Sequence, residues 1–182
     1  MVIADVGETL LHLLRQEMSP DPIPHPESIG LGSPAQANDL ALSLYFYEIR
    51  QVAERQLGMI HEGTSKLRYP PMTIDISFMI TAHSSAELQS RALDEYRILG
   101  RAMQVLYDNA ILKGSVLRGS LEGTNEELRL VMEQPPIDVF LRMFPNVPYK
   151  LSVGYSVGPI YIDSTRTRTT TRVIERDIRV KG

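Results

Sequence analysis

The stretch "MTIDISFMITAH", residues 72–83, alternates apolar and polar side chains over most of its length. Because side chains of a β-strand point alternately to the two faces of a sheet, this period of two predicts a strand. Alternation of this kind is typical of a sheet covered on one side only, which favours antiparallel pairing. The two predicted faces are Ile74, Ile76, Phe78, Ile80 and Ala82 on one side, and Thr73, Asp75, Ser77 and Thr81 on the other.

Two further segments have the same alternation and predict two more long strands. They are "DLALSLYFYEIR", residues 39–50, and "PYKLSVGYSVGPIYID", residues 148–163. In the first, Leu42 and Leu44 would face the core, with Tyr45 and Tyr47 on the opposite face. Shorter strands are expected over residues 116–121 and 127–132, because glycines and an asparagine supply turns between them.

Helical periodicity is found on either side of the first two predicted strands. Residues 3–18 carry apolar side chains at the spacing of one helical face, and four prolines at 20, 22, 24 and 26 then impose an extended, loop-rich segment over 19–38. Residues 85–109 predict a long helix capped by Ser84 or Ser85, and "PPIDVFLRMF", residues 135–144, predicts a short one. The apolar stripe expected to lie across the sheet is Leu88, Ala92, Tyr96, Leu99, Met103 and Leu106.

Together these elements predict a single α+β domain. Its sheet would be mostly antiparallel, with the long helix and the N-terminal helix packed on one face. The predicted organisation is an α+β domain over residues 1–163, followed by a basic C-terminal arm over residues 164–182.

The composition is that of a soluble globular protein, with 43% hydrophobic and 23% charged residues. No apolar run reaches the roughly 20 residues that span a bilayer, and acids near the N-terminus argue against a signal peptide, so we expect no membrane partner. The charge is unevenly placed: residues 164–182 hold six basic and two acidic residues, a charge of +4, so residues 1–163 carry −7 of the total −3. A basic arm on an acidic body favours contact with copies of itself or with acidic partners.

The sequence specifies no catalytic constellation. The four histidines have no metal-ligand spacing, no phosphate-binding loop or nucleophile elbow is found, and the chain has no cysteine. Asp75 lies among polar neighbours, so we interpret it as a solvated carboxylate rather than a general base. We therefore expect no enzyme activity, no cofactor, no metal and no small-molecule substrate.

The C-terminal segment "STRTRTTTRVIERDIRV", residues 164–180, is rich in β-forming residues and arginine. Its arginines could neutralise phosphates, but the segment has no aromatic residue for base stacking and contains Glu175 and Asp177, so direct nucleic-acid binding is disfavoured. A strand that pairs with a sheet edge of another chain fits better; an edge strand of its own domain is the alternative. The expected partner-contacting side chains are Arg166, Arg168, Arg172, Arg176 and Arg179.

Several segments, in order, resemble the tail-terminator (cap) proteins of contractile injection systems, which are phage-tail-like particles that bacteria use as toxin syringes. The resemblance covers roughly residues 3–162, and residues 51–56, "QVAERQ", depart from the family pattern. The segments that carry it are "IADVGETLLHLLR", "GSP" at 32–34, "LALSLYFYEIR", "YPPMTIDISFMITAH", "EYRILGRAMQVLYDNAIL", "ELRLVMEQPPIDVFLRMF" and "YKLSVGYSV".

The resemblance implies a structural role: a ring, expected to be a hexamer, that ends the inner tube and joins the terminal sheath ring. The implied partners are further copies of the chain, the inner tube protein and the sheath protein. Assembly would take place in the bacterial cytoplasm, after which the protein is part of the particle. A phage tail completion or neck protein, or a nucleic-acid-binding module that uses the basic arm, remain as alternatives.

Two surfaces are expected to make these contacts. Tyr45 and Tyr47 lie opposite the core leucines and are candidates for the contact between subunits, because aromatic residues are enriched at interfaces. A second layer of the same domain could cover them instead. The arm, Ser164 to Val180, is expected to add to the sheet of a neighbouring cap subunit or of the terminal sheath subunit, where its arginines would pair with acidic groups.

Overall fold

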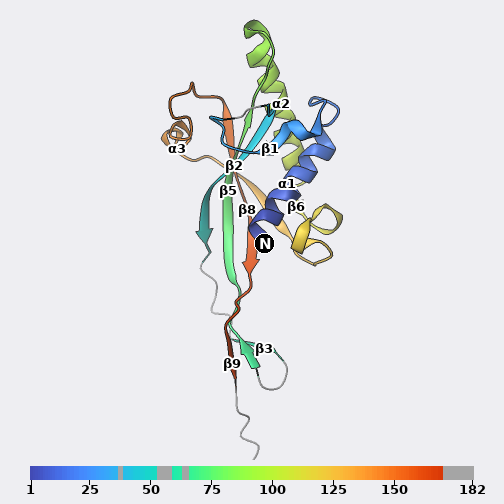
Figure 1. Cartoon of the computed structure of the whole chain (residues 1–182), viewed down its shortest axis with the longest axis vertical. Helices are drawn as coiled ribbons and strands as arrows, with labels where there is room; N and C mark the ends of the chain where they lie inside the picture. Colours follow the sequence, from blue (N-terminus) through green and yellow to red (C-terminus); the bar gives the residue numbers. More distant parts are fainter. Residues whose placement is uncertain (37–38, 53–58, 63–65, 170–182) are drawn as a thin grey trace, which may run out of the picture.

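The computed structural model describes residues 1–36, 39–52, 59–62 and 66–169, and it is a mixed α+β domain (Figure 1). A six-stranded sheet forms its centre, in the order β1-β2-β5-β8-β7-β6. Neighbouring strands are antiparallel except β1 and β2, which are parallel, so the predicted fold class is confirmed. The strands are β1 (Ile29–Leu31), β2 (Leu42–Gln51), β5 (Met72–Ala82), β6 (Ile111–Leu112), β7 (Leu128–Glu133) and β8 (Ser152–Ile162).

Two helices pack on one face of this sheet, as the sequence predicted. They are α1 (Val2–Met18) and α2 (Leu88–Asp108), which lie on the same side of the sheet (Figure 1). Between helices and sheet lies the main core, in which the rings of Phe78 and Tyr155 stack with their centroids 5.6 Å apart. Fully buried members from each element include Leu10, Leu14, Leu44, Ile76, Phe78, Ala102 and Val157.

The opposite face of the sheet is also partly covered, so the expectation of one open face is wrong there. The short helix α3 (Ile137–Leu141) and the turn after it fold over this face, and Phe140 and Phe144 bury Met79 of β5. The neighbouring polar side chains are buried as well, and they bond to one another: the Thr81 and Ser152 hydroxyls lie 2.8 Å apart. Polar residues of a strand can therefore be buried without a large penalty when their hydrogen bonds are made.

Helix α2 begins later than predicted and covers less of the sheet. Its N-cap is Glu87, whereas Ser84 accepts a hydrogen bond from the amide of Ala86 at 3.0 Å. Only the C-terminal half of the helix contacts the core; of the predicted stripe, Leu88 is 82% exposed and Tyr96 53% exposed. The reason is length, because the helix extends beyond the end of the sheet (Figure 1).

The strand expected over residues 116–121 is absent. Two 3₁₀ turns occupy this region, Gly114–Val116 and Gly119–Leu121, preceded by the two-residue strand β6. Gly114 and Gly119 have positive φ angles of 63° and 64°, which no regular strand permits. The turns pack against α1, where the hydroxyl of Thr9 accepts a hydrogen bond from the amide of Arg118 at 3.0 Å.

A second, smaller sheet projects from one end of the domain (Figure 1). We call it the distal sheet; it consists of β3 (Ile60–Glu62), β4 (Lys66–Arg68) and β9 (Thr167–Thr169), all antiparallel, in that order. The start of the basic arm, β9, is thus paired with residues of its own chain. Residues 170–182 lie outside the described part of the chain.

Candidate partner-binding surfaces

The distal sheet is a continuation of the two central strands of the domain. β4 leads directly to β5, and β8 leads to β9, so both sheets use the same two segments of chain. The last pair of the distal sheet is Arg68 with Thr167, and the first pair of the main sheet is Met72 with Ile162. Three residues, 69–71, separate them on one segment, and four residues, 163–166, on the other. Pro70 and Pro71 lie in this gap and have no amide hydrogen to donate, which interrupts the ladder.

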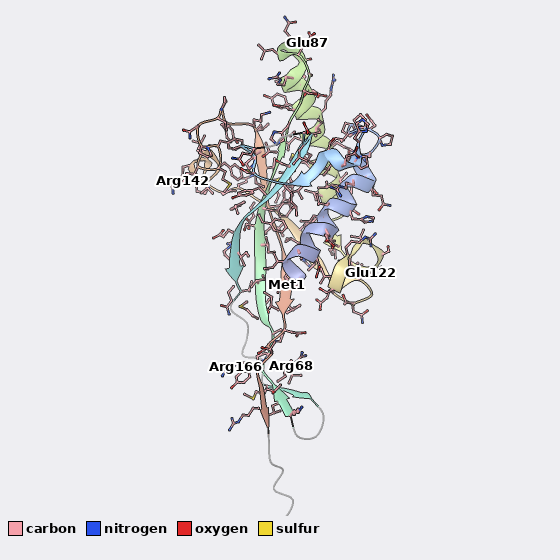
Figure 2. The ribbon with its side chains drawn as sticks, viewed as in Figure 1. Met1, Arg68, Glu87, Glu122, Arg142 and Arg166 are labelled. Atoms are coloured by element: carbon pink, nitrogen blue, oxygen red, sulfur yellow. The ribbon has the colours of Figure 1, made fainter. Side chains whose placement is uncertain are left out.

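The connection between the two sheets, which we call the neck (residues 69–71 and 163–166), is held by side chains as well as backbone. The amide of Tyr69 donates to the carbonyl of Arg166 at 3.2 Å. The guanidinium of Arg166 lies over the Tyr69 ring, 4.6 Å from its centroid, and Arg68 lies 3.5 Å from a carboxylate oxygen of Asp163. Figure 2 shows Arg68 and Arg166 side by side at this point.

The predicted partner-contacting arginines therefore divide into two groups. Arg166 makes a contact within its own chain at the neck, and Arg168 lies exposed on β9, paired in register with Leu67. Arg172, Arg176 and Arg179 fall outside the described residues. That these three contact a partner stays a prediction.

Tyr45 and Tyr47 occupy different environments. Tyr45 pairs with Met79 across the sheet and is 36% exposed. Tyr47 is the extra residue of a β-bulge, because Phe46 and Glu48 pair with consecutive residues of β5. It packs against the cluster formed by Met79 and Phe140, and this burial, together with the charge of Glu133, raises the pKa of the Tyr47 phenol. The layer formed by α3 and the turn after it thus half-buries Tyr47 and leaves Tyr45 more accessible.

The edge of the main sheet near these tyrosines is open. β1 pairs only with Leu42–Leu44, so in the described part of the chain the rest of β2 has a strand partner on one side only. Its last four residues, 48–51, are exposed. An unpaired strand edge offers backbone donors and acceptors to a strand from another chain.

A buried polar pair near the start of α2, Ser43 and His83, resembles a nucleophile with its base. The hydroxyl of Ser43 lies 2.9 Å from Nε2 of His83, a distance that would suit a nucleophile and its base. Ser43 is only 1% exposed, however, and no substrate could reach its hydroxyl. Burial first, and the charge of Lys150 second, lower the pKa of His83 to about 4, so the imidazole is neutral at pH 7.

The described residues also contain no group of three or more acids and histidines placed to hold a metal ion. None of the helices in these residues is long and apolar enough to cross a membrane. What the described chain offers instead are surfaces for protein contacts: an open strand edge, exposed apolar side chains and a projecting sheet.

The fold is that of terminator subunits of contractile injection systems. Over the whole chain it matches a solved structure described as the sheath/tube terminator of an extracellular contractile injection system (PVC), in its extended state, with a TM-score of 0.62 and 18% identity. Over 99% of the chain it matches the anti-feeding prophage cap, described as a tube-terminating cap, with a TM-score of 0.60 and 18% identity. The chain spans 64% and 62% of the lengths of these two chains.

The amino-acid sequence also matches a known protein family. The family described as the Pvc16 N-terminal domain matches residues 5–176, so the chain belongs to this family. A search of curated proteins finds no significant match.

Proposed function

We propose that this protein is a structural subunit of a contractile injection system, which forms a ring at the end of the inner tube and connects it to the terminal sheath ring. The observation that carries the proposal is the match of fold along the entire chain to two terminator subunits. Under this proposal the ring is a hexamer, it is assembled in the bacterial cytoplasm, and its role involves no catalysis.

The geometry of the chain suits two separate attachments. The domain has an exposed strand edge at β2 and exposed apolar side chains, which suit contacts with other copies. The distal sheet stands away from the domain on the two-stranded neck (Figure 1), so it can reach a partner that does not touch the domain. We assign ring contacts to the domain, with Tyr45 as the more accessible of the two tyrosines, and the sheath or neighbour contact to the distal sheet and arm.

The neck contacts exclude Arg166 from the arginines that we assign to the partner. Arg166 is engaged with Tyr69 inside the chain, so the attraction to an acidic partner falls to Arg168 and to Arg172, Arg176 and Arg179. β9 pairs with β4 of its own chain, and residues 170–180 would continue from it onto a partner's sheet.

The test compares two truncations with the full-length protein. Removal of residues 170–182 keeps β9, whereas removal of residues 164–182 also takes away β9 and the Arg166 contact. Each protein is added to purified tubes and to tubes with sheath, and ring formation and sheath retention are followed by light scattering and negative-stain images. We expect folded proteins that still close rings on tubes but hold the sheath weakly. Absence of any ring on tube ends with the full-length protein would reject the proposed function, and strongly salt-dependent DNA binding would favour the nucleic-acid alternative.

A further inference from the structure

Helix α2 carries a row of apolar residues on the side that faces away from the core. Leu93, Tyr96 and Tyr107 are 60%, 53% and 82% exposed. In chain order, Leu93, Tyr96, Gly100 and Tyr107 are separated by 3, 4 and 7 residues. These spacings place all four on one side of the helix. Ala102 and the other buried residues of α2 lie on the opposite side. We call Leu93, Tyr96, Gly100 and Tyr107 the outer row of α2.

Gly100 is notable because the domain itself does not require it. A side chain added there would meet no atom within 4 Å. Glycine in the middle of a helix is unfavourable compared with alanine, since it loses more backbone freedom on folding. A glycine between two exposed tyrosines leaves a flat gap in the row, and such a gap lets a side chain of another element approach closely.

A second exposed apolar surface lies around α3. Ile137 and Leu141, one helical turn apart, are 58% and 49% exposed, and Val147 in the following turn is 40% exposed. Phe140 and Phe144 point the other way, into the cluster with Met79. We call Ile137, Leu141 and Val147 the α3 surface; Arg142, labelled in Figure 2, marks its side of the molecule.

The two surfaces belong to helices that pack on opposite faces of the sheet. α2 packs on the core face, which holds Phe78, and α3 packs on the face that holds Met79. Val147 lies beside α2, where it lines one pocket with Arg91 and Glu95. Arg91 and Glu95 are on the opposite side of the helix from the outer row, so the outer row points away from the α3 surface. They cannot meet within one copy of the chain.

We propose that the outer row of α2 in one copy docks on the α3 surface of the next copy, with Leu141 or Ile137 entering the gap at Gly100. The inference rests on the proposed ring, and names the contact that builds it. A two-fold pair would join one surface to itself and leave the other exposed, whereas a head-to-tail contact uses both and repeats from copy to copy. Charged side chains border both surfaces: Arg97 is exposed beside the outer row, and Asp138 is exposed on α3, 3.7 Å from Arg142. An ion pair this exposed contributes little, so Asp138 is available to Arg97 of the next copy.

The absence of cysteine from the chain allows a clean crosslinking test. The variants Tyr96→Cys and Leu141→Cys are made separately, mixed in equal amounts and oxidised, with and without purified tubes. We expect a disulfide-linked dimer in the mixture and none in either variant alone. Glu122→Cys, at an exposed turn on another side of the molecule (Figure 2), replaces Tyr96→Cys in the control and should not crosslink to Leu141→Cys.

The crosslinking results distinguish a failure of this contact from a failure of the proposed ring. Rings without a crosslink in the Tyr96→Cys and Leu141→Cys mixture would overturn the contact and leave the ring proposal standing. Efficient self-crosslinking of Tyr96→Cys would also overturn it, because that result requires a two-fold pair. A protein that is monomeric with and without tubes would reject both proposals.

A substitution at Gly100 distinguishes assembly from folding. Gly100→Leu fills the gap and introduces a better helix former, so we expect an unchanged or higher melting temperature of the monomer and at least a tenfold loss in ring formation. Gly100→Ala, the control, should also keep the fold and weaken the ring less. Normal ring formation by Gly100→Leu would contradict the close approach at this position.

Discussion

At the scale of single residues, Gly119 is the position where the fold depends most directly on the absence of a side chain. It has a positive φ of 64°, and a Cβ there would lie 2.4 Å from Oδ1 of Asp5. Asp5 cannot move away freely, because it accepts a hydrogen bond from Ser120, which is the main reason that the pKa of its carboxyl is lowered. This contact ties the first turn of α1 to the 3₁₀ turn at residues 119–121.

We expect Gly119→Ala to reduce the free energy of unfolding by about 3 kcal/mol, since it adds a steric clash to the strain of a left-handed backbone. Gly123 is a matched control, because it has a similar φ of 73° and open space around it. Gly123→Ala should cost only about 1 kcal/mol. Urea denaturation measures both, and equal losses would show that the contact with Asp5 does not constrain this turn.

His83 makes the stability of the domain depend on pH. Its pKa is about 4 in the folded protein, against an ordinary value of 6.5, so the unfolded chain binds a proton more readily between these values. The neutral His83 therefore adds to the free energy of unfolding; this stabilisation is complete above pH 6.5 and is lost as the pH falls towards 4. With allowance for solvent screening, the loss is about 2 kcal/mol.

The measurement is the free energy of unfolding of wild type and of His83→Gln from pH 7.5 to pH 4. The variant keeps a polar side chain near Ser43 but does not titrate, so the difference between the two curves isolates the histidine. Glu95 and Lys150, which face His83 and lie 2.6 Å apart, are present in both proteins. Parallel curves over the whole range would mean that His83 is protonated without loss of stability.

At the scale of elements, the neck contains no buried residue: residues 69–71 and 163–166 are all exposed or half-buried. Arg166 is exposed and stacks on the half-buried Tyr69 ring, and cation–π contacts at exposed sites are worth about 0.5–1 kcal/mol. We expect Arg166→Ala to speed hydrogen exchange at Tyr69 and at residues 66–68, while the global free energy of unfolding changes by less than about 0.5 kcal/mol.

Arg168→Ala is the control for this prediction, because Arg168 is exposed on β9 next to the same residues and has no aromatic ring contact in the described chain. Its effect on exchange should be clearly smaller. Equal effects of the two variants, or faster exchange throughout β5 and β8, would show that the distal sheet is not a separate unit of stability.

The long elements could be predicted because their periodicity is strong. β5, β8 and the first half of β2 follow a period of two, and α1 follows the helical period up to its prolines. The bulge at Tyr47 could not be predicted, because residues 48–51 are all exposed and so carry no alternation of buried and exposed positions that would reveal an extra residue. β3 and β4 have three residues each, which is too short for any period to be recognised.

Two expectations were wrong because burial depends on elements distant in the sequence. Ser77 and Thr81 suggested an open face, yet α3 and its turn cover that part of the sheet. The Thr81 hydroxyl bonds to that of Ser152, and the Ser77 hydroxyl accepts from Arg50. The stripe on α2 predicted a helix that lies wholly on the sheet, but periodicity does not reveal how far a helix extends beyond its support. Both differences leave apolar side chains exposed, in the outer row of α2 and in the α3 surface.

At the scale of the whole molecule, the opposite charges of residues 1–163 and of the C-terminal end suit the two proposed kinds of contact. Residues 1–163 carry −7 and residues 164–182 carry +4. Apolar contacts between domains must overcome the repulsion of like charges, whereas the arm is attracted to any acidic surface. Added salt should therefore favour the ring and weaken the attachment of the arm.

The arm can be tested through Arg172, Arg176 and Arg179, which are expected to pair with acidic groups of a partner. Replacement of all three by glutamine should weaken sheath binding about tenfold, since three exposed charge contacts sum to roughly 1–2 kcal/mol. The residual binding should depend less on salt than that of wild type. Replacement by lysine keeps the charge but removes the bidentate geometry of arginine, so full recovery would assign the attraction to charge and partial recovery to paired hydrogen bonds. Binding of the glutamine variant that equals wild type at every salt concentration would remove these residues from the partner contact.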